Sequence, residues 1–248
     1  MSGHSKWHSI KHKKAKEDAK RGQIFTRLIK EITIAARIGG GDLNGNSRLR
    51  TAVQSGKDAN MPWTNIEKAI KKGTGELPGV TYEEVVYEGY GPGGVAILVF
   101  TQTDNKNRTT AEVRHVFSRF NGRLGEVGCV SWMFHKKGLI NIDAAGVNED
   151  KLTEIVLESG ANDLENNGEF FTITTESNVV EAIRKMIEVA GFKVTSSEIG
   201  MIPINTVKLE GKEAAQLLKL LEGLEELDDT QSVSANFDIP DEILAAQG

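Results

Sequence analysis

The chain has 248 residues with 39% hydrophobic and 6% aromatic content, and its single cysteine, Cys129, excludes an internal disulfide and a cysteine-only metal site. This length favours two or three compact units. No apolar run approaches the roughly 18 residues of a membrane span, and Trp7 and Ile10 are the only large apolar side chains in residues 2–23, which argues against a secretory signal. We therefore expect a soluble cytoplasmic protein.

The formal net charge of −5 conceals a strong asymmetry along the chain. Residues 1–75 carry 16 Lys or Arg against 6 Asp or Glu, a net +10, whereas residues 76–248 carry 14 against 29, a net −15. Such a division is typical of a protein whose front contacts a polyanion and whose remainder stays soluble.

The basic front is predicted to be an arm followed by helices. Residues 2–14 are too polar to bury a face, so an extended arm is expected. Apolar side chains at spacings of three and four predict a helix over residues 15–38, which the glycines at 39–41 end. Two shorter helices are expected over residues 47–59 and 62–72, the second opening with Pro62.

After residue 77 the periodicity changes to that of strands. Residues 82–90 and 95–103 predict a hairpin joined by the GPGG turn, followed by a helix over residues 109–121. The GPGG segment does not match a phosphate-binding loop, because such a loop opens a helix and this one connects two strands.

The next 70 residues follow the order β-α-β-β-α-β of a ferredoxin-like sandwich. Strands are expected over residues 139–142, 163–164, 170–175 and 193–198, and helices over residues 148–159 and 179–190.

A last βαβ unit, with strands over residues 206–209 and 232–238 and a helix over 212–224, is too small to stand alone. It is expected to return to the first hairpin and complete that sheet. The predicted class is thus α+β multidomain, an N-terminal helical domain followed by two ferredoxin-like α/β sandwich domains, one inserted in the other. The predicted domains are residues 1–77, residues 78–133 plus 203–240, the inserted residues 134–202, and a frayed tail over 241–248.

The arm supplies the strongest functional signal. Lysines and arginines that neutralise phosphates release counterions, and an indole offers a stacking surface for a base. The alternative is a solvated charged face, but the excess covers a whole domain. The candidate nucleic-acid-binding residues are Lys6, Trp7, Lys11, Lys13, Lys14, Lys16, Lys20, Arg21, Arg27, Arg48 and Arg50.

A second basic cluster spans residues 104–137. Thr109 and Glu112 have the spacing of a capping box, and amides at that helix start could hold a phosphate. Capping alone also explains these two residues. The secondary phosphate-binding candidates are Lys106, Arg108, Thr109, Arg114 and Arg119.

No catalytic set and no metal site is apparent. His4, His8 and His12 recur every four residues, but no ligand completes a tetrahedral set, and additional phosphate contacts are the better interpretation. Ser131 and Cys129 lack an obvious base other than His115 or His135. The acids Glu225, Glu226, Asp228 and Asp229 are expected to solvate the end of a helix. No cofactor and no small-molecule substrate is evident.

Several segments resemble the YebC family of probable transcriptional regulatory proteins, which includes the mitochondrial translational activator of cytochrome c oxidase subunit I. They are the opening GHSKWHSIKHKKAKEDAKRGQIFTRLIKEI, then NSRLRTAV, NMPWTNIEKAIKKGTG, YEGYGPGGVAI and TDNKNRTTAEVRHVF. The resemblance runs from Gly3 to about Asp238. It starts too early to leave room for a mitochondrial presequence, which favours a bacterial cytoplasmic member.

The resemblance implies three domains, no catalysis and no obligate cofactor. It also implies one of two roles: binding DNA to regulate transcription, or acting at the ribosome on structured RNA to relieve stalling, for example at consecutive prolines. A regulator that recognises a specific DNA sequence would need a recognition helix. Arg48, Arg50, Gln54 and Lys57 on one short helix fit this role only weakly. An arm of lysines suits shape recognition of RNA slightly better.

Overall fold

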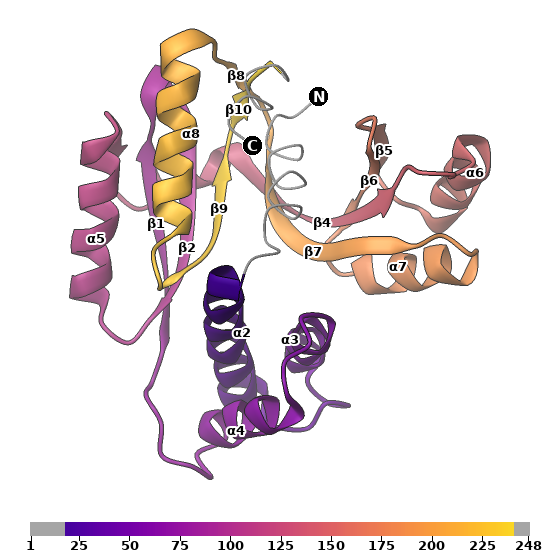
Figure 1. The fold of residues 1–248 in the computed structure, drawn as a ribbon, viewed down its shortest axis with the longest axis horizontal. Coiled ribbons are helices and arrows are strands. Elements are labelled where there is room, and N and C mark those ends of the chain that lie inside the picture. Colours follow the sequence, from indigo (N-terminus) through magenta and orange to yellow (C-terminus); the bar gives the residue numbers. More distant parts are fainter. Residues whose placement is uncertain (1–17, 241–248) are drawn as a thin grey trace.

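The structure is a computed structural model in which residues 18–240 are described. Its elements form a helical unit, a sheet carrying two long helices, and a second sheet carrying two shorter ones (Figure 1). The α+β multidomain class predicted from the sequence is confirmed. None of the helices between residues 18 and 240 combines the length and apolar character that crossing a membrane requires.

Three amphipathic helices build the helical unit, α2 (Asp18–Gly39), α3 (Ser47–Asp58) and α4 (Trp63–Gly73). They share a core in which Ile32, Leu49 and Ile66 are fully buried. Asn46 fixes the angle between α2 and α3, because its Oδ1 accepts from the Leu49 amide at 3.0 Å while its Nδ2 donates to the Ala35 carbonyl at 2.8 Å. Pro62 lies just before α4, at the N-cap, rather than within its first turn.

The predicted hairpin is present as β1 (Glu83–Tyr90) and β2 (Ala96–Thr103), paired antiparallel with Tyr87 opposite Val99. A short 3-10 turn, Pro92–Gly94, connects them. Gly93 and Gly94 have φ angles of 66° and 78°, in the left-handed region that glycine tolerates without strain. The GPGG segment therefore works as a hairpin turn.

The C-terminal segment returns to this hairpin, as the sequence predicted. Strand β9 (Thr230–Ala235) pairs with β2, and the two-residue β3 (Arg123–Leu124), which the pattern did not predict, pairs with β1. The resulting order is β3-β1-β2-β9. Both hairpin strands are central, so this sheet differs from the ferredoxin-like order expected for it, in which one hairpin strand lies at the edge.

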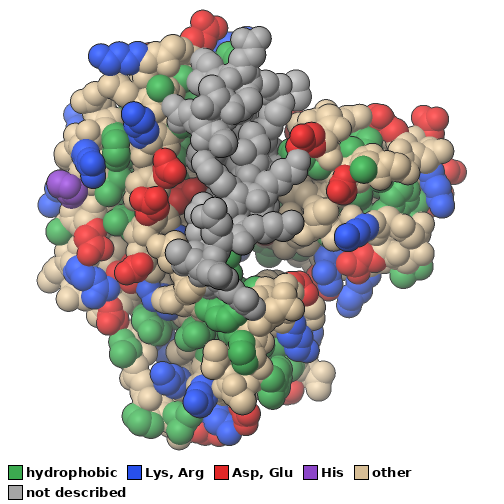
Figure 2. All heavy atoms as spheres, in the orientation of Figure 1, with side chains coloured by type: hydrophobic (Ala, Val, Ile, Leu, Met, Phe, Trp, Pro, Cys, Tyr) green, Lys and Arg blue, Asp and Glu red, His purple; other side chains and the backbone are tan. Residues whose placement is uncertain are grey.

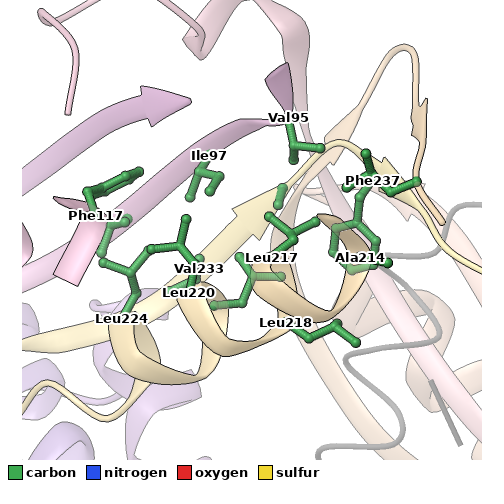
Figure 3. Packing of buried hydrophobic residues seen from close by; sticks show 14 of the residues in the cluster. Val95, Ile97, Phe117, Ala214, Leu217, Leu218, Leu220, Leu224, Val233 and Phe237 are labelled. Carbon is green, nitrogen blue, oxygen red and sulfur yellow. The ribbon is translucent and has the colours of Figure 1, made fainter. Parts of the chain in front are cut away.

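Two helices, α5 (Lys106–Arg119) and α8 (Gly211–Glu225), cover one face of this first sheet. Figure 3 shows leucines of α8 pointing toward Phe117 of α5 and toward the sheet residues Ile97 and Val233. This cluster forms the core of the largest unit.

The helix predicted over residues 109–121 begins three residues earlier than expected. Its N-cap is Asn105, whose Oδ1 accepts from the Arg108 amide at 3.1 Å. The predicted capping box of Thr109 and Glu112 is therefore wrong. Thr109 lies one turn inside the helix and is fully buried.

Two long strands connect the sheets. Strands β4 (Phe134–Asp143) and β7 (Val194–Pro203) are both longer than the pattern predicted, because their outer ends pair with each other beside the first sheet. Phe134 packs there against Ala96 and Leu98 on the face that α5 and α8 leave open. In Figure 1 the pair curves from the first sheet to the second.

The second sheet has the predicted ferredoxin-like order, β5-β6-β4-β7. Its core joins Ile140 and Ile173 of the sheet to Leu152 and Ile187 of the helices. The remaining elements are β5 (Asp163–Asn166), β6 (Phe170–Glu176), α6 (Glu149–Ser159) and α7 (Val180–Val189).

The strand expected over residues 232–238 is interrupted at Asn236. Its Oδ1 accepts from the Ala96 amide at 2.7 Å and its own amide donates to the Ala96 carbonyl at 3.1 Å, which ends the pairing with β2. The chain then forms β10 (Phe237–Asp238), parallel to β8 (Val207–Lys208). The expected βαβ unit is therefore divided between two sheets.

The packing of Phe117 yields a stability prediction. Phe117→Ala removes a fully buried ring from the core between α5, α8 and the sheet. The resulting cavity should lower the free energy of unfolding by about 3–5 kcal/mol. Urea denaturation followed by circular dichroism measures the change. Val127→Ala is the control, because that side chain is 90% exposed. Equal losses in the two variants would contradict the packing.

Candidate nucleic-acid interface

Most of the predicted arm lies outside the described residues. This holds for Lys6, Trp7, Lys11, Lys13, Lys14 and Lys16. Lys20 and Arg21 fall in the first turn of α2, where only the backbone is described. The assignment of these residues to nucleic acid stays a prediction.

Beyond its first turn, α2 uses cations to contact the turn that follows α8. The guanidinium of Arg27 donates to the Glu225 carbonyl. Burial lowers the pKa of Arg27, and the charges of Glu225 and Asp228 oppose that shift. Lys30 is buried, and its Nζ donates to the Asp228 carbonyl at 2.9 Å and to Asp229 Oδ1 at 2.7 Å. Both cations therefore join two units of the same molecule.

Asp229 is the centre of this contact. Its side chain is 4% exposed, and donors from three other elements converge on its carboxylate. Besides Lys30 on Oδ1, Oδ2 accepts from Thr109 at 2.7 Å, from Arg108 at 2.7 Å and from Thr103 at 3.0 Å. Burial by itself raises the pKa of Asp229, but the hydrogen bonds from Lys30, Arg108 and Thr109 dominate and hold it well below its usual range.

The sequence interpretation of Asp229 was wrong. It was expected to solvate a helix end together with its acidic neighbours, yet it is buried whereas Asp228 is exposed. No local pattern distinguishes the two adjacent aspartates, because the donors to Asp229 come from residues 120 or more positions away.

A second polar network joins α3 to the first sheet. Arg48 donates from Nε and Nη2 to the Glu31 carboxylate at 2.7 and 2.8 Å, and also pairs with Glu84 at 2.6 Å. Gln102 of β2 donates to Glu31 at 2.5 Å. Hydrogen bonds to Glu31 and Glu84 raise the pKa of Arg48 further above its ordinary value. This guanidinium therefore serves the contact between the helical unit and the sheet.

The other polar side chains of α3 also have internal partners. Arg50 donates to the Leu43 carbonyl at 2.8 Å, and Gln54 donates to Asp58 at 2.8 Å. The Lys57 ammonium lies 5.6 Å from the centre of the Trp63 ring. The four side chains considered for a recognition helix thus all have partners within the molecule.

The secondary candidates on α5 divide into two groups. Arg108 and Thr109 bind Asp229, and Arg108 also pairs with Asp104 at 2.8 Å. The side chains of Arg108 and Thr109 are therefore bound to carboxylates of the protein itself, and phosphate binding at this helix start stays a prediction. Lys106, Arg114 and Arg119 are exposed. Figure 2 shows Lys, Arg and His side chains at the left margin, over α5.

Glu88 organises the loop that carries Cys129 and Ser131. Burial and the nearby charge of Glu88 raise the pKa of the Cys129 thiol, which disfavours the reactive thiolate. The Glu88 carboxylate accepts from the amides of Gly128, Val130 and Ser131 at 2.7–2.8 Å, so it clamps this loop. Within residues 18–240, no group of three or more His, Cys, Asp or Glu is arranged to hold a metal ion.

The Asp229 contact predicts a specific pH dependence. Because the folded pKa of Asp229 is depressed, its contribution to stability is fully present above the unfolded pKa of about 4 and is lost as the pH falls toward the folded value. Asp229→Asn removes the charge opposite buried Lys30 and should cost about 3–5 kcal/mol at pH 7, with a smaller further loss on acidification than the parent shows. Urea unfolding between neutral pH and about pH 3 measures both effects.

The matched control is Asp228→Asn, since that side chain is exposed and only its backbone carbonyl accepts a hydrogen bond from Lys30. A similar loss of stability in the two variants would show that Asp229 is not the centre of the contact.

Two family models match the chain. Residues 5–76 match the TACO1/YebC protein N-terminal domain, and residues 82–237 match the TACO1/YebC second and third domain. Together they account for nearly the whole sequence.

Individual relatives agree with these matches. A probable transcriptional regulatory protein of Desulforapulum autotrophicum is 56% identical over 99% of this chain and 100% of its own length, and one of Geobacter sulfurreducens is 58% identical over 98% of both. A crystal structure of a conserved hypothetical protein from Aquifex aeolicus matches with a TM-score of 0.86 and 50% identity, covering 93% of this chain and 95% of that one. The chain therefore belongs to the TACO1/YebC family.

Proposed function

We propose that the protein is a non-enzymatic regulator of gene expression that binds the phosphate backbone of nucleic acid. The observation that carries the proposal is the net +10 of residues 1–75 in a chain whose remainder is acidic. Relatives more than half identical over their full length bear the name of probable transcriptional regulatory proteins, which supports the regulatory role.

The helical unit extends the positive field of the arm. Beyond the first turn of α2, five of its cations are exposed, namely Arg37, Arg50, Lys57, Lys68 and Lys72. Exposed cations on a folded unit beside a basic arm favour binding that depends strongly on salt, because each phosphate contact releases counterions.

The side chains of α3 favour recognition of shape over recognition of base sequence. A helix that reads bases needs side chains free to reach base edges. Arg48 and Gln54 instead bind carboxylates of the protein itself. This observation favours a second candidate function, in which the target is structured RNA at the ribosome and the protein assists translation.

Competition binding at physiological salt tests the proposal and separates the two targets. The full chain is bound to a labelled promoter duplex and challenged with ribosomal RNA, and then the reverse. We expect both to bind with steep salt dependence and RNA to compete at least as well as DNA. Preference for the duplex by orders of magnitude would exclude the translation role. Failure to bind either at low ionic strength would overturn the proposed function.

Replacing Lys11, Lys13 and Lys14 by Glu should abolish association with nucleic acid, because three phosphate contacts become repulsive. The melting temperature should change little, since the sequence predicts that residues 2–14 are too polar to bury a face. Electrophoretic mobility shift and thermal melting measure the two properties. Glu at the exposed Lys193, Lys208 and Lys212 is the control with the same change in net charge. Retained association in the arm variant would remove the arm from the mechanism.

A further inference from the structure

The outer face of α5 carries a row of cations that the core does not need. Val113 and Phe117 are fully buried and fix which side of the helix faces inward. Arg114, His115 and Arg119 are exposed; His115 and Arg119 lie opposite the buried side, and Arg114 lies at its border. His115 and Arg119 are four residues apart and so lie one above the other on the helix surface.

The row continues onto the edge of the first sheet. After α5 the chain turns at Asn121, whose φ angle of 59° lies in the left-handed region, and enters β3. Arg123 of β3 is exposed, and β3 is the edge strand beside β1. We call this surface the α5 stripe and define it as Arg114, His115, Arg119 and Arg123.

The arginines of the α5 stripe are not committed to carboxylates of the described chain. Among residues 18–240, the cations that pair with acids include Lys30, Arg48 and Arg108, whereas Arg114, Arg119 and Arg123 form no such ion pair. The guanidinium of Arg119 lies 5.3 Å from the ring of Phe120, a contact that leaves its donors available.

The other exposed side chains of α5 are mostly small or polar. Lys106, Asn107, Arg108, Ala111 and Ser118 are the other exposed residues of the helix, and Glu112 is half-buried. At about 1.5 Å per residue, Arg114 and Arg119 are roughly 8 Å apart along the helix axis, and Arg123 follows them on β3. Arginine forks match phosphate oxygens in paired geometry.

The α5 stripe is also fixed relative to the helical unit. Arg108 and Thr109, in the first turns of α5, bind the same carboxylate of Asp229 that Lys30 of α2 binds. Lys30 lies about 18 Å along α2 from Asp18, where the arm joins. Two cationic surfaces on one rigid frame can contact one polyanion together and gain avidity.

We propose that the α5 stripe is a second nucleic-acid-binding surface, which contacts the phosphate backbone of a structured RNA or a duplex without reading bases. The inference rests on the proposed function and deepens it, since it assigns a binding surface outside the basic N-terminal unit. The stripe contacts phosphates through Arg114, Arg119 and Arg123, while the arm contacts another part of the same nucleic-acid molecule.

The test replaces Arg114, Arg119 and Arg123 by Gln in the full chain. Binding to an RNA hairpin and to a DNA duplex of matched length is measured by fluorescence anisotropy from about 50 to 200 mM salt. The slope of log Kobs against log[salt] should become shallower by about 2–3, with affinity at low salt reduced roughly tenfold or more. Gln at Lys193, Lys208 and Lys212 removes the same charge from exposed positions elsewhere and should leave the slope unchanged.

A thermal melt of each variant separates binding from folding, and Lys at the three arginine positions should restore most of the slope. An unchanged slope in the Gln variant, or an equal change in the control, overturns the α5 stripe while the proposed function stands if the parent still binds. Failure of the parent to bind either nucleic acid overturns the proposed function itself. Loss confined to RNA or to DNA supports the stripe and identifies which backbone it fits.

Discussion

The arrangement of the helical unit against the first sheet depends on one buried carboxylate. Asp229 accepts hydrogen bonds from α2, β2 and α5, and its partner Lys30 is itself buried. A buried cation is stable only when its counter-charge is held in place. The threonines of β2 and α5 hold Asp229, so the ion pair can form in only one relative position of the two units. The basic helical unit is thereby fixed to the first sheet and its helices by this contact.

This constraint divides the cations of the chain into two populations. Arg27, Lys30, Arg48 and Arg108 are used inside the molecule, on carbonyls and carboxylates of the second half of the chain or of the sheet. Others, such as Arg37, Lys68 and Arg114, remain exposed. Part of the positive charge of residues 1–75 therefore holds the helical unit against the first sheet. Only the exposed population is available to a polyanion.

The shape of the molecule follows from two long strands of the second sheet whose outer ends pack beside the first sheet. β4 begins and β7 ends beside the first sheet, where Phe134 packs on Ala96. In the second sheet, β4 is a central strand and β7 is an edge strand. An insertion carried by a paired strand couple is stiffer than one carried by loops. The acidic inserted unit is thus held at a defined position relative to the basic helical unit.

Sequence periodicity alone determined the class, the three groups of elements, the hairpin and the return of the last strand to the first sheet. These features depend on local apolar spacing and turn chemistry, which Gly93 and Gly94 illustrate, and the charge asymmetry pointed to a polyanion. Only the tertiary structure decided that Asn105 rather than Thr109 begins α5, that Asn236 divides the last strand, and which arginines stay free. The physical reason is that a polar side chain takes its role from partners far away in sequence. Asp228 and Asp229 are identical neighbours in the chain, yet burial beside Lys30 and Arg108 makes only the second one the centre of the fold.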